Sequence, residues 1–95
     1  MSASLLERYG PWALVAGASD GIGEAFAREL GAAGLNLVLL ARRAPLLNEL
    51  AADLRQTHGI ATRCIAVDLT SDGMADRVRR ETADLEIGLR FTGNK

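Results

Sequence analysis

A cluster of three glycines has the residue types and spacing best suited to holding an anionic ligand. It runs Gly17-Ala-Ser-Asp-Gly21-Ile-Gly23, a spacing of G-xxx-G-x-G that differs from the common dinucleotide fingerprint and from a Walker loop. Glycine tolerates positive φ and lets the backbone approach a phosphate that a Cβ would obstruct. A helix beginning here would add free N–H groups and the positive end of its dipole. The cluster predicts a pyrophosphate-binding turn with candidate contacts at Gly17, Ser19, Asp20, Gly21, Ile22 and Gly23. The alternative is a tight turn that binds nothing.

Two adjacent arginines, Arg42 and Arg43, follow the glycines in the sequence. They stand where a dinucleotide-binding site carries the residue that distinguishes NAD from NADP. A site for NAD carries Asp or Glu about 20 residues after the glycines, where the carboxylate accepts from the ribose hydroxyls. An arginine there can pair with a 2′-phosphate in bidentate fashion, with Ser19 as a second donor. The pattern therefore favours NADP(H), with NADPH bound in preference to NADH. The alternative is a pair of solvated arginines at a helix start.

An acidic residue, Asp68, stands directly after an apolar segment and is followed by Leu69. Ligands of open α/β sheets bind at the carboxyl ends of the strands. Asp68 is therefore a candidate acceptor for the adenine amino group, with Leu69 beside it. The alternative is an aspartate that caps a turn.

The elements that must position these residues alternate along the chain. Continuous apolar runs predict buried strands at residues 12–16, 35–41, 61–67 and 85–89, the last weakened by Gly88. Helical spacing predicts helices at residues 21–33, from Pro45 to Gly59, and from Ser71 or Asp72 to about Ala83. This alternation predicts an α/β fold, a doubly wound parallel sheet of about four strands in the order 3-2-1-4 with right-handed crossovers.

Composition limits the possible classes of protein. Ninety-five residues correspond to one domain, 1–95, and 48% hydrophobic with 24% charged residues is typical of a globular chain. A net charge of −1 argues against a nucleic-acid or anionic-membrane partner. One cysteine and one histidine exclude an internal disulfide and a multi-histidine metal site. No run long enough to span a bilayer and no secretory signal are visible, so we expect a cytoplasmic protein.

The remaining reactive residues have structural explanations. Cys64 lies among apolar neighbours and is expected to be inert, and His58 is expected at a helix C-terminus. The basic run at residues 77–80 is interspersed with acidic residues, which indicates a solvated helix face. The sequence shows no catalytic residue and no metal ligand set.

Residues 9–89 resemble the short-chain dehydrogenase/reductase family. The resemblance rests on the glycine cluster after an apolar strand, the arginine that ends the second strand, and Asp68-Leu69 after the third. The segments at 9–23 and 85–89 are similar to the branch containing 17β-hydroxysteroid dehydrogenases and 3-oxoacyl-CoA reductases. The resemblance implies a Rossmann-like fold and hydride transfer between a nicotinamide and an alcohol or ketone.

The sequence departs from the family in its catalytic residues. The family uses a Tyr with a Lys four residues later, but here the only Tyr is Tyr9, Ala13 lies four residues on, and the only Lys is Lys95. The family's Asn-Ala-Gly motif after strand four is also missing from residues 90–95. We therefore expect the NADP(H)-binding portion of an oxidoreductase that is inactive by itself, the small-molecule substrate binding only in a full-length member.

Two other functions remain open, a stand-alone nucleotide-binding or regulatory module and a structural fragment that binds nothing. In the family the sheet continues beyond strand four, so an open edge and a partly bare sheet face are expected here. Open edges and uncovered apolar surface promote association. We therefore expect a homodimer or a strand-swapped oligomer.

Overall fold

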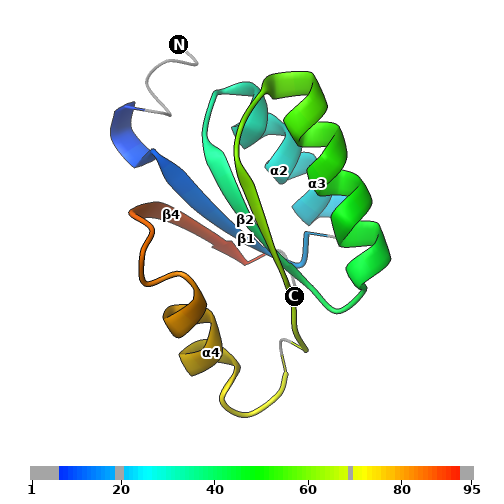
Figure 1. Ribbon diagram of the computed structural model, residues 1–95, viewed down its shortest axis with the longest axis vertical. Helices are drawn as coiled ribbons and strands as arrows, with labels where there is room; N and C mark the ends of the chain where they lie inside the picture. Colours follow the sequence, from blue (N-terminus) through cyan, green and yellow to red (C-terminus); the bar gives the residue numbers. More distant parts are fainter. Residues whose placement is uncertain (1–6, 19–20, 69, 93–95) are drawn as a thin grey trace.

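The computed structural model describes residues 7–18, 21–68 and 70–92, which form a sheet with helices on its two faces (Figure 1). The predicted site residues Ser19, Asp20 and Leu69 lie outside the described residues. The elements follow in the order β1 (Trp12–Ala16), α2 (Gly21–Ala32), β2 (Asn36–Ala41), α3 (Ala44–His58), β3 (Thr62–Ala66), α4 (Met74–Glu81) and β4 (Ile87–Thr92). Strands and helices alternate as the sequence predicts.

The four strands form one parallel sheet in the order β3-β2-β1-β4, which confirms the predicted topology. The register pairs Ala16 at the end of β1 with Leu40 of β2, and Ala41 of β2 with Ala66 of β3. The carboxyl ends of these three strands therefore lie side by side at one edge of the sheet. Loops that leave this edge are the ones able to share a ligand.

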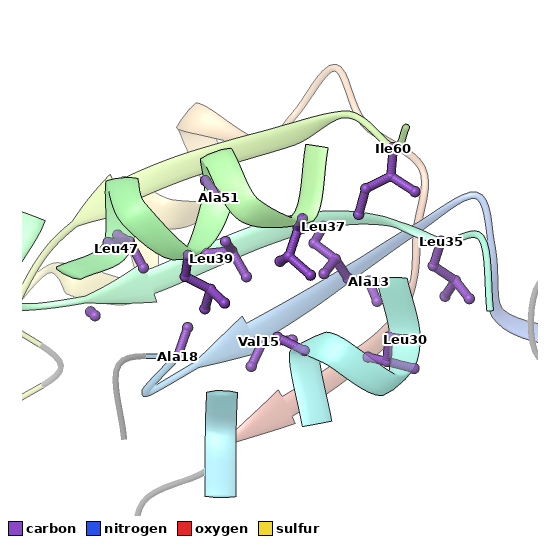
Figure 2. Close-up of a cluster of buried hydrophobic side chains, with 14 residues drawn as sticks. Ala13, Val15, Ala18, Leu30, Leu35, Leu37, Leu39, Leu47, Ala51 and Ile60 are labelled. Carbon is purple, nitrogen blue, oxygen red and sulfur yellow. The ribbon is translucent and has the colours of Figure 1, made fainter. Parts of the chain in front are cut away.

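Two apolar clusters hold the layers together, one on each face of the sheet. On one face, alternate residues of β1 and β2 pack under α2 and α3, and Figure 2 shows Leu37 and Leu39 of β2 in one cluster with Leu47 and Ala51 of α3. On the other face, Val38 and its strand neighbours are covered by α4. Side chains of a strand alternate between faces, so a sheet covered on both sides needs a continuous apolar run. The apolar side chains of β4 stay partly exposed, and so do Trp12 of β1 and Cys64 of β3.

The face that α2 turns to the sheet consists mainly of small residues. Gly23, Ala27 and Gly31 are buried together with Leu30, whereas Ile22 is 70% exposed. A Cβ on Gly31 would lie 3.2 Å from the side chain of Leu54 in α3. The small residues let α2 lie close to the sheet and to α3, and Ile22 points away from this face.

The sequence prediction is wrong for the boundaries of the last strand and the last helix. β4 runs to Thr92 instead of ending at residue 89, because Gly88 sits at a register shift opposite Trp12 and Ala13 and does not interrupt the strand. A Cβ at Gly88 would lie 2.1 Å from the carbonyl oxygen of Tyr9, so only glycine fits there. Helix α4 begins after Gly73, which has a φ of 78° and provides no side-chain cap.

Ser71 was expected to be a possible cap for that helix, but its hydroxyl instead donates to the backbone carbonyl oxygen of Asp68 at 2.8 Å. Residues 7–9, within the short N-terminal segment before β1, are helical. None of the helices among the described residues has the length and apolar character needed to cross a membrane.

Candidate functional site

Backbone hydrogen bonds bring the three predicted motifs to one edge of the sheet. The amides of Gly17 and Ala18 both donate to the carbonyl oxygen of Leu40, at 2.9 and 3.0 Å, so the glycine turn is tied to the end of β2. The amide of Val67 donates to the carbonyl oxygen of Ala41 at 2.9 Å, which ties the start of the Asp68 loop to the same strand end. The glycine turn and the Asp68 loop are thus both hydrogen-bonded to the end of β2, which Arg42 follows directly.

Each glycine of the turn has a different physical role. Gly17 has a φ of 76°, in the left-handed region that favours glycine. A Cβ on Gly23 would lie only 2.1 Å from the carbonyl oxygen of Gly17, so this glycine allows the helix start to pack on the turn. A Cβ on Gly21 would meet no atom of the described residues within 4 Å. The space in front of Gly21 is therefore open to a ligand, and the first N–H groups of α2 have no partner within the helix.

The two arginines lie at the exit of β2 and are both exposed. Arg43 is the residue before α3, in an extended conformation with φ −98° and ψ 98°, and its side chain caps nothing. Neither arginine forms an ion pair with an acidic residue of the described chain. Two cationic residues therefore follow the end of β2, to which the glycine turn is hydrogen-bonded, and both are exposed to a ligand such as a phosphate.

The carboxylate of Asp68 is held by the residue two positions later. Its Oδ1 accepts from the backbone N–H of Thr70 at 2.9 Å and from the Thr70 hydroxyl at 2.7 Å. These two hydrogen bonds, helped by the charge of nearby Arg42, hold the pKa of Asp68 below its usual value. The group is therefore an ionised acceptor at neutral pH. Sequence reasoning missed Thr70, although the spacing Asp-x-Thr is a known signal for such a turn.

A cleft of about 330 Å³ between α2 and α3 is a different environment. Its only cation, among the described residues, is Arg28, which donates to Glu24 at 3.0 Å and to Asp53 at 2.6 Å. These bonds raise the pKa of Arg28, and the pairing with Arg28 lowers the pKa of Asp53. Since Glu49 adds a further carboxylate to the lining, the cleft does not suit a phosphate.

The remaining reactive side chains behave as structural residues. The thiol of Cys64 faces the carbonyl oxygen of Leu47 at 3.8 Å, and burial raises the pKa of this thiol. His58 ends α3 immediately before Gly59, whose φ of 70° closes the helix. Across residues 7–18, 21–68 and 70–92, no three metal-binding side chains gather into a site.

Comparison with known proteins agrees with this geometry. The sequence model for short chain dehydrogenases matches residues 11–86. The chain is 39% identical over 85 residues to a 7beta-hydroxysteroid dehydrogenase of Collinsella aerofaciens, covering 90% of this chain and 32% of that protein. It is 39% identical over 82 residues to the very-long-chain 3-oxoacyl-CoA reductase of Mus musculus (86% and 26% covered), and 38% over 86 residues to human 17-beta-hydroxysteroid dehydrogenase type 3 (90% and 28% covered).

Solved structures give the same result. A 7beta-hydroxysteroid dehydrogenase superposes with a TM-score of 0.84 at 38% identity, over 93% of this chain and 33% of that one. A short-chain dehydrogenase from Sphingobium yanoikuyae in complex with NADPH superposes with a TM-score of 0.71 at 38% identity, over 76% and 28%. The chain thus spans about a third or less of the length of these relatives. Its sequence and its fold place it in the short-chain dehydrogenase/reductase family of oxidoreductases.

Proposed function

We propose that this chain is the NADP(H)-binding portion of a short-chain oxidoreductase that transfers hydride between a nicotinamide and an alcohol or ketone. The observation that carries the proposal is the meeting of the glycine turn, Arg42 and the Asp68 loop at one edge of the sheet, linked by hydrogen bonds to Leu40 and Ala41. The NADPH complex of the Sphingobium yanoikuyae relative supports the choice of cofactor.

Each part of the cofactor has a proposed partner. The pyrophosphate would occupy the open space at Gly21 and accept hydrogen bonds from the first backbone N–H groups of α2. Arg42 and Arg43 would pair with the 2′-phosphate, which a carboxylate at this position would repel. The carboxylate of Asp68 would accept a hydrogen bond from the adenine amino group. The exposed Ile22 side chain would provide an apolar contact beside the turn, and Gly17, Ser19, Asp20, Gly23 and Leu69 complete the proposed site.

Parallel titrations with NADPH and NADH test the proposal. We expect the chain to prefer NADPH, and the charge reversal Arg42→Glu to remove the preference, a change of about tenfold or more because a charged hydrogen bond is lost and a repulsion is gained. Arg80→Glu makes the same charge change on the exposed side of α4 and should leave the ratio unchanged.

Three results would contradict the proposal. An unchanged NADPH/NADH ratio in Arg42→Glu would remove the role of the guanidinium. An equal loss in Arg80→Glu would indicate a general charge effect. Binding of neither nucleotide would favour the alternative in which the chain is a structural fragment.

We further propose that the isolated chain does not turn over and that it associates through β4. The family's Tyr-xxx-Lys has no counterpart in this sequence, where Tyr9 is followed by Ala13 at the Lys position. β4 is one of the two edge strands of the described sheet, and its Leu89 and Phe91 are partly exposed. The ring of Phe91 lies 4.2 Å from the ring of Phe26, tilted by 34°. Light scattering at high protein concentration tests the association, and a monomer there would contradict it.

A further inference from the structure

In the loop after β3, four hydrogen bonds are made to one residue, Asp68. Both donors of Thr70, the backbone N–H and the hydroxyl, reach the same oxygen of Asp68, Oδ1. The N–H and hydroxyl of Ser71 reach the backbone carbonyl oxygen of Asp68 at 3.0 and 2.8 Å. In the part of the chain that the structure describes, no donor reaches Oδ2. The two neighbours therefore act on different groups, Thr70 on the carboxylate and Ser71 on the backbone.

Two hydrogen bonds to a single oxygen restrict the rotation of the Asp68 side chain. With Oδ1 occupied, the remaining acceptor capacity of the carboxylate lies mainly on Oδ2, in a fixed direction. An ionised carboxylate accepts hydrogen bonds and cannot donate them. Its partner at this sheet edge must therefore be a donor, and an acceptor at the same place would be repelled.

We propose that Thr70 is a positioning residue that makes the nucleotide site selective for a purine with a 6-amino group. Through the hydrogen bonds of Thr70, the Oδ2 atom of Asp68 is presented to the base, where the amino group of adenine donates to it. Hypoxanthine carries a carbonyl oxygen at that position and leaves two acceptors facing each other. The inference rests on the proposed function, because it assumes that the nucleotide lies at this edge of the sheet.

Two ligands that differ only in the base isolate this effect. The affinity of the 95-residue chain is measured for NADPH and for the reduced nicotinamide hypoxanthine dinucleotide phosphate, which keeps the 2′-phosphate and the nicotinamide. We expect the chain to prefer NADPH by about tenfold, the usual effect of a hydrogen bond to a charged group. Asp68→Ala should abolish this preference.

The variants at position 70 test the positioning role. Thr70→Val keeps the shape but loses the hydroxyl, and should reduce the preference about threefold, since one neutral donor of the pair is lost. Thr70→Ser restores the hydroxyl and should restore the preference. Ser71→Ala is the matched control, because it loosens the same loop without touching the carboxylate, and any loss it causes should be equal for the two ligands. Thr70 is exposed, so the variants should fold, which circular dichroism verifies.

The possible outcomes separate this inference from the proposed function. Equal weakening of the two ligands in Thr70→Val would overturn the positioning role, as would a wild type that does not distinguish the bases. If the wild type still prefers NADPH to NADH in these cases, the proposed function survives. If neither NADPH nor its hypoxanthine counterpart binds, the proposed function and the inference fail together.

Discussion

Two glycines only two residues apart should respond to the same substitution in opposite ways. In Gly23→Ala, the new Cβ would lie 2.1 Å from the carbonyl oxygen of Gly17 and 2.8 Å from its carbon, and real Cβ atoms essentially never come within 3.0 Å of such neighbours. In Gly21→Ala, the new Cβ meets nothing within 4 Å among residues 7–18, 21–68 and 70–92. The first change therefore disturbs the fold, and the second fills space that the proposed pyrophosphate needs.

The loss in the free energy of unfolding caused by Gly23→Ala depends on which atoms must move to make room for the new Cβ. The obstacle is backbone, and the turn that contains it is held by the two hydrogen bonds to the carbonyl oxygen of Leu40. Overpacking commonly costs 1–3 kcal/mol, and we expect about 3 kcal/mol here because no flexible side chain can yield. The free energy of unfolding of a chain this size is roughly 5–14 kcal/mol, so the loss is large. It corresponds to a fall of about 15 °C in Tm.

Gly21→Ala should leave the free energy of unfolding unchanged or slightly higher, since alanine favours helix by up to about 1 kcal/mol over glycine. Its affinity for NADPH should nevertheless fall by about tenfold or more, because the backbone can no longer approach the phosphate. Urea denaturation followed by circular dichroism measures the first quantity, and calorimetric titration with NADPH measures the second. An unchanged affinity in Gly21→Ala, or a stability of Gly23→Ala within about 0.5 kcal/mol of wild type, would refute the reasoning.

Three further changes test the packing and the acid sensitivity of the fold. Leu39→Ala, at a fully buried site, should lower the free energy of unfolding by about 2–5 kcal/mol in urea denaturation, whereas Leu46→Ala, at a site 43% exposed, should cost much less. Gly88→Ala should lower Tm in a thermal melt, because its Cβ would lie 2.1 Å from a backbone oxygen. The hydrogen bond from Arg63 holds the pKa of Asp84 below its usual value. This pair therefore stabilises the fold above the ordinary carboxyl pKa and loses its effect as the pH falls through the lowered value, so Asp84→Asn should show a smaller loss of stability between pH 7 and pH 3.

Local patterns were sufficient for the order of elements, and they also named the candidate site residues that the structure brings to one edge of the sheet. The apolar runs at residues 12–16 and 35–41 are long enough only for buried strands, and the structure has strands there. Gly59 ends α3 as expected, because a left-handed residue is required at that cap. The sequence predicted a fourth strand but gave the wrong bounds for it, because Gly88 suggested an interruption. The close backbone of Tyr9 that requires this glycine is distant in sequence and could not be inferred.

The site shows the same division between local and tertiary information. Residue types alone pointed to the glycine turn, Arg42 and Asp68, because phosphate binding and left-handed turns are local requirements of the backbone. Their convergence depends on the parallel pairing of β1, β2 and β3, which joins residues far apart in the chain. Thr70 escaped notice because its hydroxyl could equally have faced water.

By itself, the sequence determined which segments become strands and helices and which residues could hold a nucleotide, since backbone preference and side-chain chemistry are properties of short stretches. Only the tertiary structure decided which face of each helix is buried and which glycine is open to a ligand. Ile22 and Gly23 are neighbours, yet the first is 70% exposed and the second is buried against Gly17. The reason is that adjacent residues of a helix point in directions about 100° apart, and the contacts of α2 with the strands and α3 decide which of these directions faces the core.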